Sequence, residues 1–147
     1  MKLSTVLGRI RKASWRHWHH LEAYGRAFEF LDLDARRVVG GGADSIAVLL
    51  GDGRVFKMTT REITPEMGHR PFDLPILERG LRPWDGVTIG YYVQPLAQAA
   101  SQTDLLRVAE LIRGAGYHFC EPFIEQIGNY QGQPWLLDPF AVKAALQ

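Results

Sequence analysis

The sequence predicts an α+β protein: an N-terminal amphipathic helix, then an antiparallel meander of about five strands, then a reduced helical half with one β-hairpin. Three observations support this fold class. Apolar residues recur at three- and four-residue steps over residues 3–28, the period of a helix face. Asp52-Gly53 separates two β-rich runs, which is a strong hairpin signal. Ser101 stands as a helix cap before a second apolar-periodic segment.

Composition and charge narrow the class of protein. The 147 residues, 46% of them apolar, fit one domain, which we divide into residues 1–37, 38–94 and 95–147. The net charge is +1, although residues 1–39 hold eight Lys or Arg against four acids. The single cysteine, Cys120, favours a reducing compartment. Since no stretch has the pattern of a membrane span or a signal peptide, we expect a cytoplasmic protein without a membrane partner.

The first helix is expected to be long, continuous and basic on its outer faces. Trp15 and Trp18 lie among its arginines, so contact with nucleic-acid phosphates is one alternative function. Most charge runs are solvated helix faces, and we therefore do not expect a nucleic-acid partner. His17 and His20 could share one face as metal ligands, but no acid or cysteine beside them completes a site.

The sheet is expected to begin on either side of a glycine run, Gly40-Gly41-Gly42. Three glycines let a backbone come close to a ligand and turn its amides toward phosphate, although an ordinary turn would use them too. Lys57 lies on the strand that returns from Asp52-Gly53. It needs a counter-charge or a ligand phosphate, because burying an unpaired lysine is costly.

The next segment is expected to supply the partner of Lys57. Thr64-Pro65-Glu66 has the pattern of a short helix start, and Glu66 is the candidate partner, with Glu62 as the alternative. Residues 73–80 then predict an edge strand because they contain Pro75. After a connection over residues 82–86, residues 87–94 predict a strong strand.

Chemistry is expected in the C-terminal half, after the helix capped by Ser101. Glu121 and Gln126 lie five residues apart on a loop, and a hairpin through Gly132 leads to Asp138. Two acids and an amide arranged in this way can build a magnesium and phosphate site. A thiol nucleophile at Cys120 is disfavoured, since His118 is too near in sequence to meet it on a helix or strand.

The order of these motifs over residues 38–142 resembles a protein kinase. The glycine run with its following serine resembles the glycine-rich loop, Lys57 the strand lysine and residues 94–96 the hinge. Residues 119–121 with Gln126 resemble the catalytic loop, and residues 138–140 resemble the metal-binding Asp motif.

The resemblance implies a role for each matching residue, with ATP and Mg²⁺ as cofactors. Lys57, paired with Glu66, would hold the nucleotide phosphates. Asp138 and Gln126 would hold magnesium, and Glu121 would take the proton of the acceptor hydroxyl. The glycine-rich loop would be formed by Gly40, Gly42 and Ser45.

The sequence departs from the kinase pattern both by substitutions at motif positions and by the lack of a segment after the Asp motif. Glu121 and Gln126 are each one methylene longer than the family's Asp and Asn, and angstrom-scale misplacement of reacting groups can cost about 10²-fold in rate. Phe119 and Cys120 replace the loop's His and Arg, and Ala141 replaces a glycine. A kinase continues past the Asp motif into a substrate platform, whereas this sequence ends at Gln147.

We therefore expect a kinase-like scaffold or inhibitor of the phage or mobile-element type that binds a protein partner, with a vestigial ATP pocket. Trp84 and Trp15 beside arginines would anchor the partner, since Trp and Arg dominate binding hot spots, whereas for Trp18 core packing is the favoured interpretation. The alternative is an active, minimal ATP-dependent phosphotransferase. Nucleic-acid contact through the first helix is the third reading.

Overall fold

A computed structural model of the chain describes residues 1–9, 19–41 and 44–145. It divides into two compact units, each described by itself below. Unit 1 comprises residues 1–63 and 77–94, and unit 2 comprises residues 64–76 and 95–147. The sequence grouped residues 64–76 with the sheet, whereas the structure places them with the C-terminal half.

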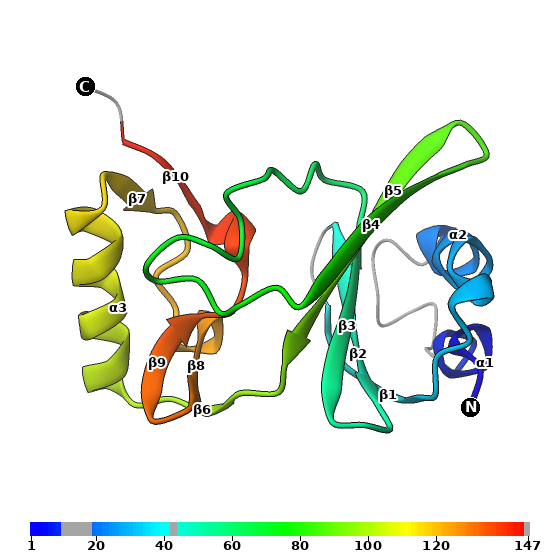
Figure 1. The fold of residues 1–147 in the computed structure, drawn as a ribbon, viewed down its shortest axis with the longest axis horizontal. Helices are drawn as coiled ribbons and strands as arrows, with labels where there is room; N and C mark the ends of the chain where they lie inside the picture. Colours follow the sequence, from blue (N-terminus) through cyan, green and yellow to red (C-terminus); the bar gives the residue numbers. More distant parts are fainter. Residues whose placement is uncertain (10–18, 42–43, 146–147) are drawn as a thin grey trace. The chain divides into compact units, whose positions relative to one another are not determined.

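Unit 1 contains the antiparallel sheet of five strands that the sequence predicts. The strands lie in the order β1-β2-β3-β5-β4 (Figure 1). Their bounds are Ala35–Gly41 for β1, Ser45–Leu50 for β2, Arg54–Thr59 for β3, Glu78–Trp84 for β4 and Val87–Pro95 for β5. Gly53, at the turn between β2 and β3, has a φ of +87°, which confirms the predicted Asp-Gly hairpin.

The N-terminal helical segment was expected to be one long helix, and this is wrong. The structure has α1 (Leu3–Leu7), α2 (His19–Ala27) and a 3₁₀ turn η2 (Glu29–Leu31). Residues 10–18, with Trp15, Trp18 and His17, lie outside the described part. The apolar period continues across both helices because α1 and α2 bury their residues in the same core. The apolar period therefore indicated that both helices bury a face in one core, and not that they form one continuous helix.

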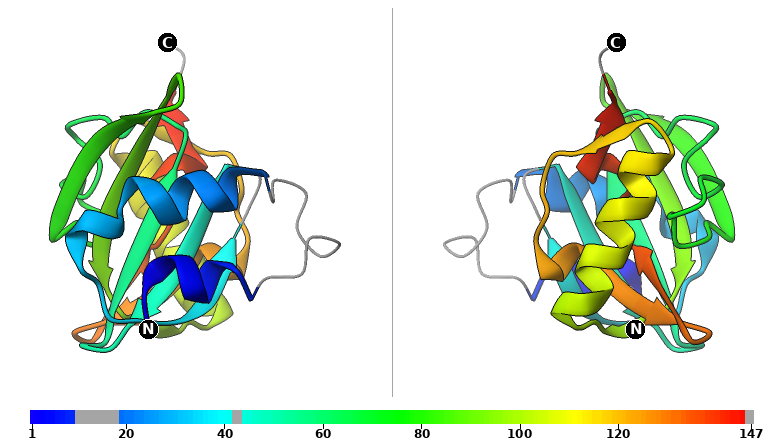
Figure 2. Two further views of the ribbon diagram at one scale, coloured as in Figure 1. Left: turned by 90° about the vertical axis from the view of Figure 1, so that its right-hand side faces the viewer. Right: turned by 90° about the vertical axis from the view of Figure 1, so that its left-hand side faces the viewer.

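The core of unit 1 lies between these helices and one face of the sheet. Both helices lie on the same side of the sheet, and the left view of Figure 2 shows them in front of it. Tyr24 of α2 and Phe28, which follows this helix, are large buried side chains that belong to one cluster with Phe56 of β3 and Tyr91 of β5. A Cβ at Gly25 would lie 3.1 Å from the Cα of Ser4, so glycine allows α1 and α2 to approach closely.

The outer hairpin of the sheet differs from the expected connection over residues 82–86. The turn is only Asp85-Gly86, both with positive φ, and β4 pairs with β5 as far as Trp84 opposite Val87. Two positive φ angles in a two-residue loop are typical of a type I′ turn, which suits the twist of a hairpin. The strand predicted over residues 73–80 lies further along the chain in the structure, as β4 (Glu78–Trp84). Pro83 is accommodated because β4 is an edge strand of this sheet.

Unit 2 is built on one helix and two small sheets. Helix α3 (Gln102–Gly114) contacts the strands β7 (Tyr117–Phe119), β8 (Ile127–Tyr130) and β9 (Gln133–Leu136). Strand β7 pairs with β10 (Val142–Ala144), and β8 lies between β9 and β6 (Gln98–Ala99). The right view of Figure 2 shows α3 at the front. Val108 and Ile112 bury the inner face of this helix.

The two predicted helix starts have different outcomes. Ser101 caps α3 as expected: its hydroxyl accepts the Asp104 N–H, and the Asp104 carboxylate accepts the Ser101 N–H in return. Thr64 begins no helix. Residues 65–69 form turns, and the Thr64 hydroxyl donates to Glu66 instead of capping. Gly68, at a φ of +86°, departs from helical geometry before a second turn can form.

No helix among the described ranges is long and apolar enough to cross a membrane.

The capping box of α3 makes a pH-dependent contribution to stability. The Ser101 N–H, with help from the Asn129 amide, holds the pKa of Asp104 below its usual range. A lowered folded-state pKa gives stability that is complete above the ordinary carboxyl pKa and is lost as pH falls through the folded value. We expect Asp104→Asn to destabilise the protein at pH 7 and to approach the wild type near pH 2, measured by urea unfolding. A deficit of Asp104→Asn that is the same at every pH would contradict this.

Candidate functional site

Lys57 belongs to a row of residues that crosses three strands of unit 1. The register pairs Gly40 with Ala47 and Ala47 with Lys57, so one glycine of the predicted loop shares a row with the predicted lysine. Phe56 enters the core beneath the helices, and Lys57 therefore points to the opposite face of the sheet. The Lys57 Nζ atom lies 5.7 Å from the centroid of the Tyr92 ring, within reach of a cation–π interaction.

The predicted glycine-rich loop is mostly strand in the described residues. Gly40 lies within β1, Ser45 opens β2, and Gly42 falls outside the described part. Gly40 does not have a positive φ, and a Cβ there would meet only the Cβ of Ala47, at 3.9 Å. The local backbone therefore does not require glycine at position 40. Phosphate binding by Gly40, Gly42 and Ser45 stays a prediction.

The end of this β1–β2 connection is anchored by α2. The hydroxyl of buried Tyr24 donates to the Asp44 carbonyl at 3.1 Å, and the Thr60 N–H donates to the same oxygen at 3.3 Å. Burial raises the pKa of Tyr24 to about 12. The phenol, which is protonated at neutral pH in any case, therefore remains a donor well into the alkaline range.

In unit 2 the structure brings Glu121 and Gln126 together. The Gln126 Nε2 atom donates to Glu121 Oε2 at 2.9 Å. The Leu137 N–H donates to the Gln126 carbonyl at 2.7 Å, so the residue before Asp138 lies against the same loop. The expected hairpin through Gly132 is confirmed, with Tyr130 opposite Gln133 and positive φ at Gln131 and Gly132.

Asp138 is oriented by the 3₁₀ turn η4 (Pro139–Ala141). Its Oδ1 atom caps this turn by accepting the Phe140 N–H at 2.9 Å. The amide nitrogen of Gln126 faces Glu121, so the Gln126 amide oxygen is the atom that a metal would use. A carboxylate and an amide oxygen are ligands that suit Mg²⁺, and the donor types at Asp138 and Gln126 fit the predicted ion. Among the described residues no three His, Cys, Asp or Glu side chains form a metal-binding group.

Two predicted pairings join different units. Lys57 belongs to unit 1, whereas Glu66 and Asp138 belong to unit 2. The salt bridge of Lys57 with Glu66, and a crevice shared by Lys57 and Asp138, therefore stay predictions. Glu66 is exposed, and its carboxylate accepts the Thr64 hydroxyl at 2.6 Å.

Sequence reasoning missed a buried ion pair in unit 2. The Arg70 guanidinium donates to both carboxylate oxygens of Asp73, at 2.7 and 3.1 Å, and to the Pro139 carbonyl at 2.8 Å. The guanidinium also lies over the rings of Phe72 and Tyr117, at 5.1 and 5.2 Å from their centroids, within reach of cation–π interactions. Asp73 further accepts the backbone N–H groups of residues 68 and 70. The sequence signal was an Arg and an Asp three residues apart beside proline and phenylalanine.

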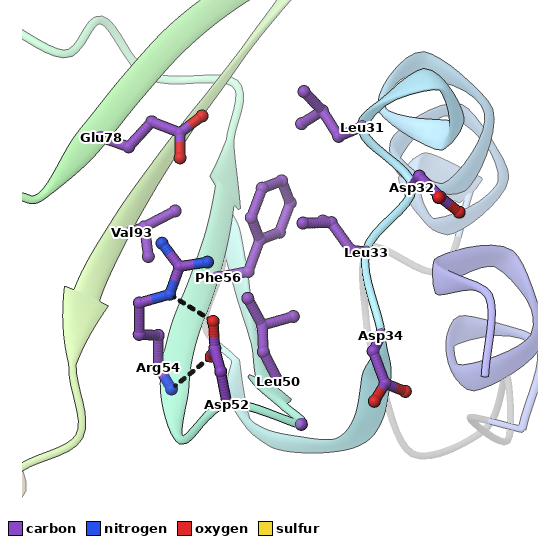
Figure 3. A pocket seen from close by; sticks show the side chains of 11 residues that line it. Leu31, Asp32, Leu33, Asp34, Leu50, Asp52, Arg54, Phe56, Glu78 and Val93 are labelled. Carbon is purple, nitrogen blue, oxygen red and sulfur yellow. Dashed lines mark hydrogen bonds and ion pairs between the residues drawn. The ribbon is translucent and has the colours of Figure 1, made fainter.

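Sequence reasoning also missed a cavity in unit 1, shown in Figure 3. It has a volume of about 510 Å³, within the range of roughly 300–1,000 Å³ that is typical of small-ligand pockets. Its apolar lining comes from η2, the segment after it, and the strands β2, β3 and β5. These apolar residues are Leu31, Leu33, Leu50, Phe56 and Val93.

The charged groups around this cavity are mostly paired with one another. Asp52 binds Arg54 at 2.7 Å, and Asp34 binds Arg36 and the N-terminal ammonium at 2.8 and 3.1 Å. Glu78 forms no ion pair with another described residue, and its carboxylate points into the cavity (Figure 3).

A hydrogen bond from Tyr91 of β5 orients the Glu78 carboxylate. It accepts the hydroxyl of Tyr91 at 3.1 Å, and burial together with this carboxylate raises the pKa of Tyr91. A phenol is protonated at neutral pH in any case, so Tyr91 donates to Glu78 there, and the raised pKa extends this donor state to higher pH.

Next to the cavity, apolar side chains are exposed at the end of the outer hairpin. Arg82 lies opposite Ile89 and Trp84 opposite Val87, so all four point to the helix side of the sheet. The Arg82 guanidinium lies 4.6 Å from the centroid of the Phe30 ring, which is 62% exposed. Val87 is 42% exposed, and Trp84 is half-buried against the core. We call Phe30, Arg82, Trp84 and Val87 the hairpin patch.

No protein-family model matches this chain, and no curated protein matches it either.

The Arg70–Asp73 pair should dominate the stability of unit 2. Asp73→Asn keeps a hydrogen-bond acceptor but leaves the guanidinium buried without a counter-charge, and breaking a buried pair in this way costs about 3–5 kcal/mol. We expect a loss of that size in urea unfolding, and a partial recovery when Arg70→Met is added. Glu110→Gln, on the exposed face of α3 in the same unit, should change stability by less than about 0.5 kcal/mol. Equal effects of Asp73→Asn and Glu110→Gln would refute a central role of the pair.

Proposed function

We propose that this chain is a reduced kinase-like domain that acts as a scaffold or inhibitor by binding a partner protein. The observation that carries the proposal is the hairpin patch, in which Arg82 lies over the exposed ring of Phe30 beside Trp84 and Val87. Aromatic residues and arginine are enriched at binding hot spots, and contiguous exposed apolar side chains mark interaction sites.

The construction of the patch supports this use. Trp84 and Val87 flank a two-residue turn and therefore cannot move far from each other, and η2 places Phe30 against Arg82, which points to the same side of the sheet. A preorganised surface loses less side-chain entropy on binding. The proposal does not require phosphate transfer, which agrees with the substitutions at Glu121 and Gln126.

A second candidate function is ATP-dependent phosphate transfer by the same kinase-like domain. The hydrogen bond between Gln126 and Glu121, and the backbone bond from Leu137 to Gln126, favour it. They hold two of the predicted residues beside the strand that leads to Asp138. Mg²⁺, when bound, would neutralise phosphate charge; Asp138 and Gln126 would hold it, and Glu121 would accept a proton from the attacking hydroxyl.

Photo-crosslinking tests the binding surface. A benzophenone amino acid at position 30 should crosslink a discrete partner in cells of the native source, because Phe30 lies in the patch. The matched control is position 106, a leucine of α3 that is 65% exposed but lies in the other unit. The Arg82→Glu variant should abolish the crosslink from position 30, and Lys57→Ala should leave it intact. Crosslinks of equal yield from positions 30 and 106, or none from either, would argue against the proposal.

A thermal-shift scan with ATP and Mg²⁺ tests the second function. A ligand at a hundred times its dissociation constant stabilises the folded state by about 2.7 kcal/mol. If the nucleotide site is intact, we expect the melting temperature to rise, and Lys57→Ala and Asp138→Ala to remove the rise. An unchanged melting temperature at millimolar ATP would exclude the second function, and the scaffold function would be the one that remains. A shift that both variants retain would show that the nucleotide binds elsewhere.

A further inference from the structure

We propose that the cavity of unit 1 is the receptor for an arginine side chain of the partner protein, so that its apolar lining covers the aliphatic stem and Glu78 binds the guanidinium. This inference rests on the proposed function for the source of the arginine. The chemistry of the cavity can be tested without the partner.

The cavity and the hairpin patch lie along the same face of unit 1. On β4, Glu78 and Arg82 are an even number of residues apart and so point to the same side of the sheet. On η2 and the segment after it, Phe30 belongs to the patch and the next residue, Leu31, lines the cavity. A partner segment bound at the patch would therefore pass directly to the cavity.

The apolar residues that line the cavity favour a ligand side chain with an aliphatic stem. Leu50, Phe56 and Val93 come from three different strands and form the floor of the cavity, since each is at most 4% exposed. The accessible apolar wall above this floor comes from the half-buried Leu31 and Leu33. An arginine places three methylenes before its charged head and can cover such a wall while its head stays at the rim.

The charge at the rim selects a cation over an anion. Arg54 also points into the cavity, but Asp52 neutralises its guanidinium: Arg54 Nε donates to Asp52 Oδ2 at 2.7 Å, and the other carboxylate oxygen accepts the Arg54 backbone N–H at 3.0 Å. Asp32 also lines the cavity, but its carboxylate points away from it, and Asp34 is paired with the N-terminal ammonium and Arg36 (Figure 3). The charge that remains uncompensated inside the cavity is therefore that of Glu78.

Glu78 is also oriented to receive a guanidinium. Its Oε1 atom accepts the Tyr91 hydroxyl, and the Tyr91 ring stacks on Phe56, with centroids 5.2 Å apart. One carboxylate oxygen is thus held by a core residue, and the Oε2 atom is the available acceptor. Charge-assisted hydrogen bonds between guanidinium and carboxylate are among the strongest in proteins.

The test uses N-acetyl-arginine methylamide as the probe and N-acetyl-citrulline methylamide as its uncharged isostere. Titrations of the full chain are followed by ¹H–¹⁵N chemical shifts. We expect the arginine probe to shift amides around the cavity, those of residues 33, 50, 78 and 93, and to bind at least about tenfold more tightly than the citrulline probe. A charge-assisted hydrogen bond is worth enough free energy for this factor.

Substitutions in the cavity test which charged residues determine the preference for arginine. Glu78→Gln should remove the preference for arginine, and Arg54→Gln should strengthen arginine binding because it leaves Asp52 unpaired. Glu110→Gln, which lies in unit 2, should change nothing. The spectrum of each free variant reports whether its fold is intact.

Equal binding of the arginine and citrulline probes, tighter binding of N-acetyl-glutamate methylamide, or no binding at all would overturn the inference. If position 30 crosslinks a partner and Glu78→Gln affects neither the partner nor the probe, the inference fails while the proposed function stands. If the probe binds as expected and no partner crosslinks, the chemistry of the cavity is supported and the proposed function fails.

Discussion

Unit 1 depends on the packing of three aromatic rings, Phe28, Phe56 and Tyr91. Phe28 meets the other two rings edge to face, with centroids 5.8 and 5.1 Å apart, and Phe56 stacks on Tyr91. Such pairs contribute roughly 0.5–1.5 kcal/mol each beyond the burial of their area. This cluster joins the segment after α2 to the middle of the sheet. It also determines the surface above it, because Phe56 lines the cavity and the Tyr91 hydroxyl holds Glu78.

Unit 2 differs in that a buried ion pair lies beside its apolar core. The Arg70–Asp73 pair is almost fully buried, at 6% and 1% side-chain exposure, and it connects the segment over residues 64–76 with Pro139. Since Pro139 follows Asp138 directly, the same pair helps to fix the turn that Asp138 caps. Glu121 and Gln126, by contrast, lie near the surface and satisfy each other. Of the residues for which phosphate chemistry was predicted, Asp138 is therefore the one next to the buried pair.

Local signals in the sequence were sufficient wherever one short segment determines its own backbone. The Asp52-Gly53 turn, the hairpin through Gly132 and the Ser101 cap were all predicted correctly, because positive φ and capping are properties of a few neighbouring residues. The expected long first helix failed because a three- and four-residue period reports which face is buried, and two separate helices can share one face. Thr64 failed as a cap because no helix follows it: residues 65–69 form turns, and Gly68 has a positive φ.

By itself, then, the sequence determined the α+β class, the sheet of about five strands and most of its turns. The tertiary structure alone decided which distant residues share a site. Arg70 meets a carbonyl 69 residues away, and Arg82 meets Phe30 across more than fifty residues. The cavity takes its walls from η2, the segment after it and four strands. Proximity of this kind depends on strand order and packing, and these arise from long-range contacts that no local pattern encodes.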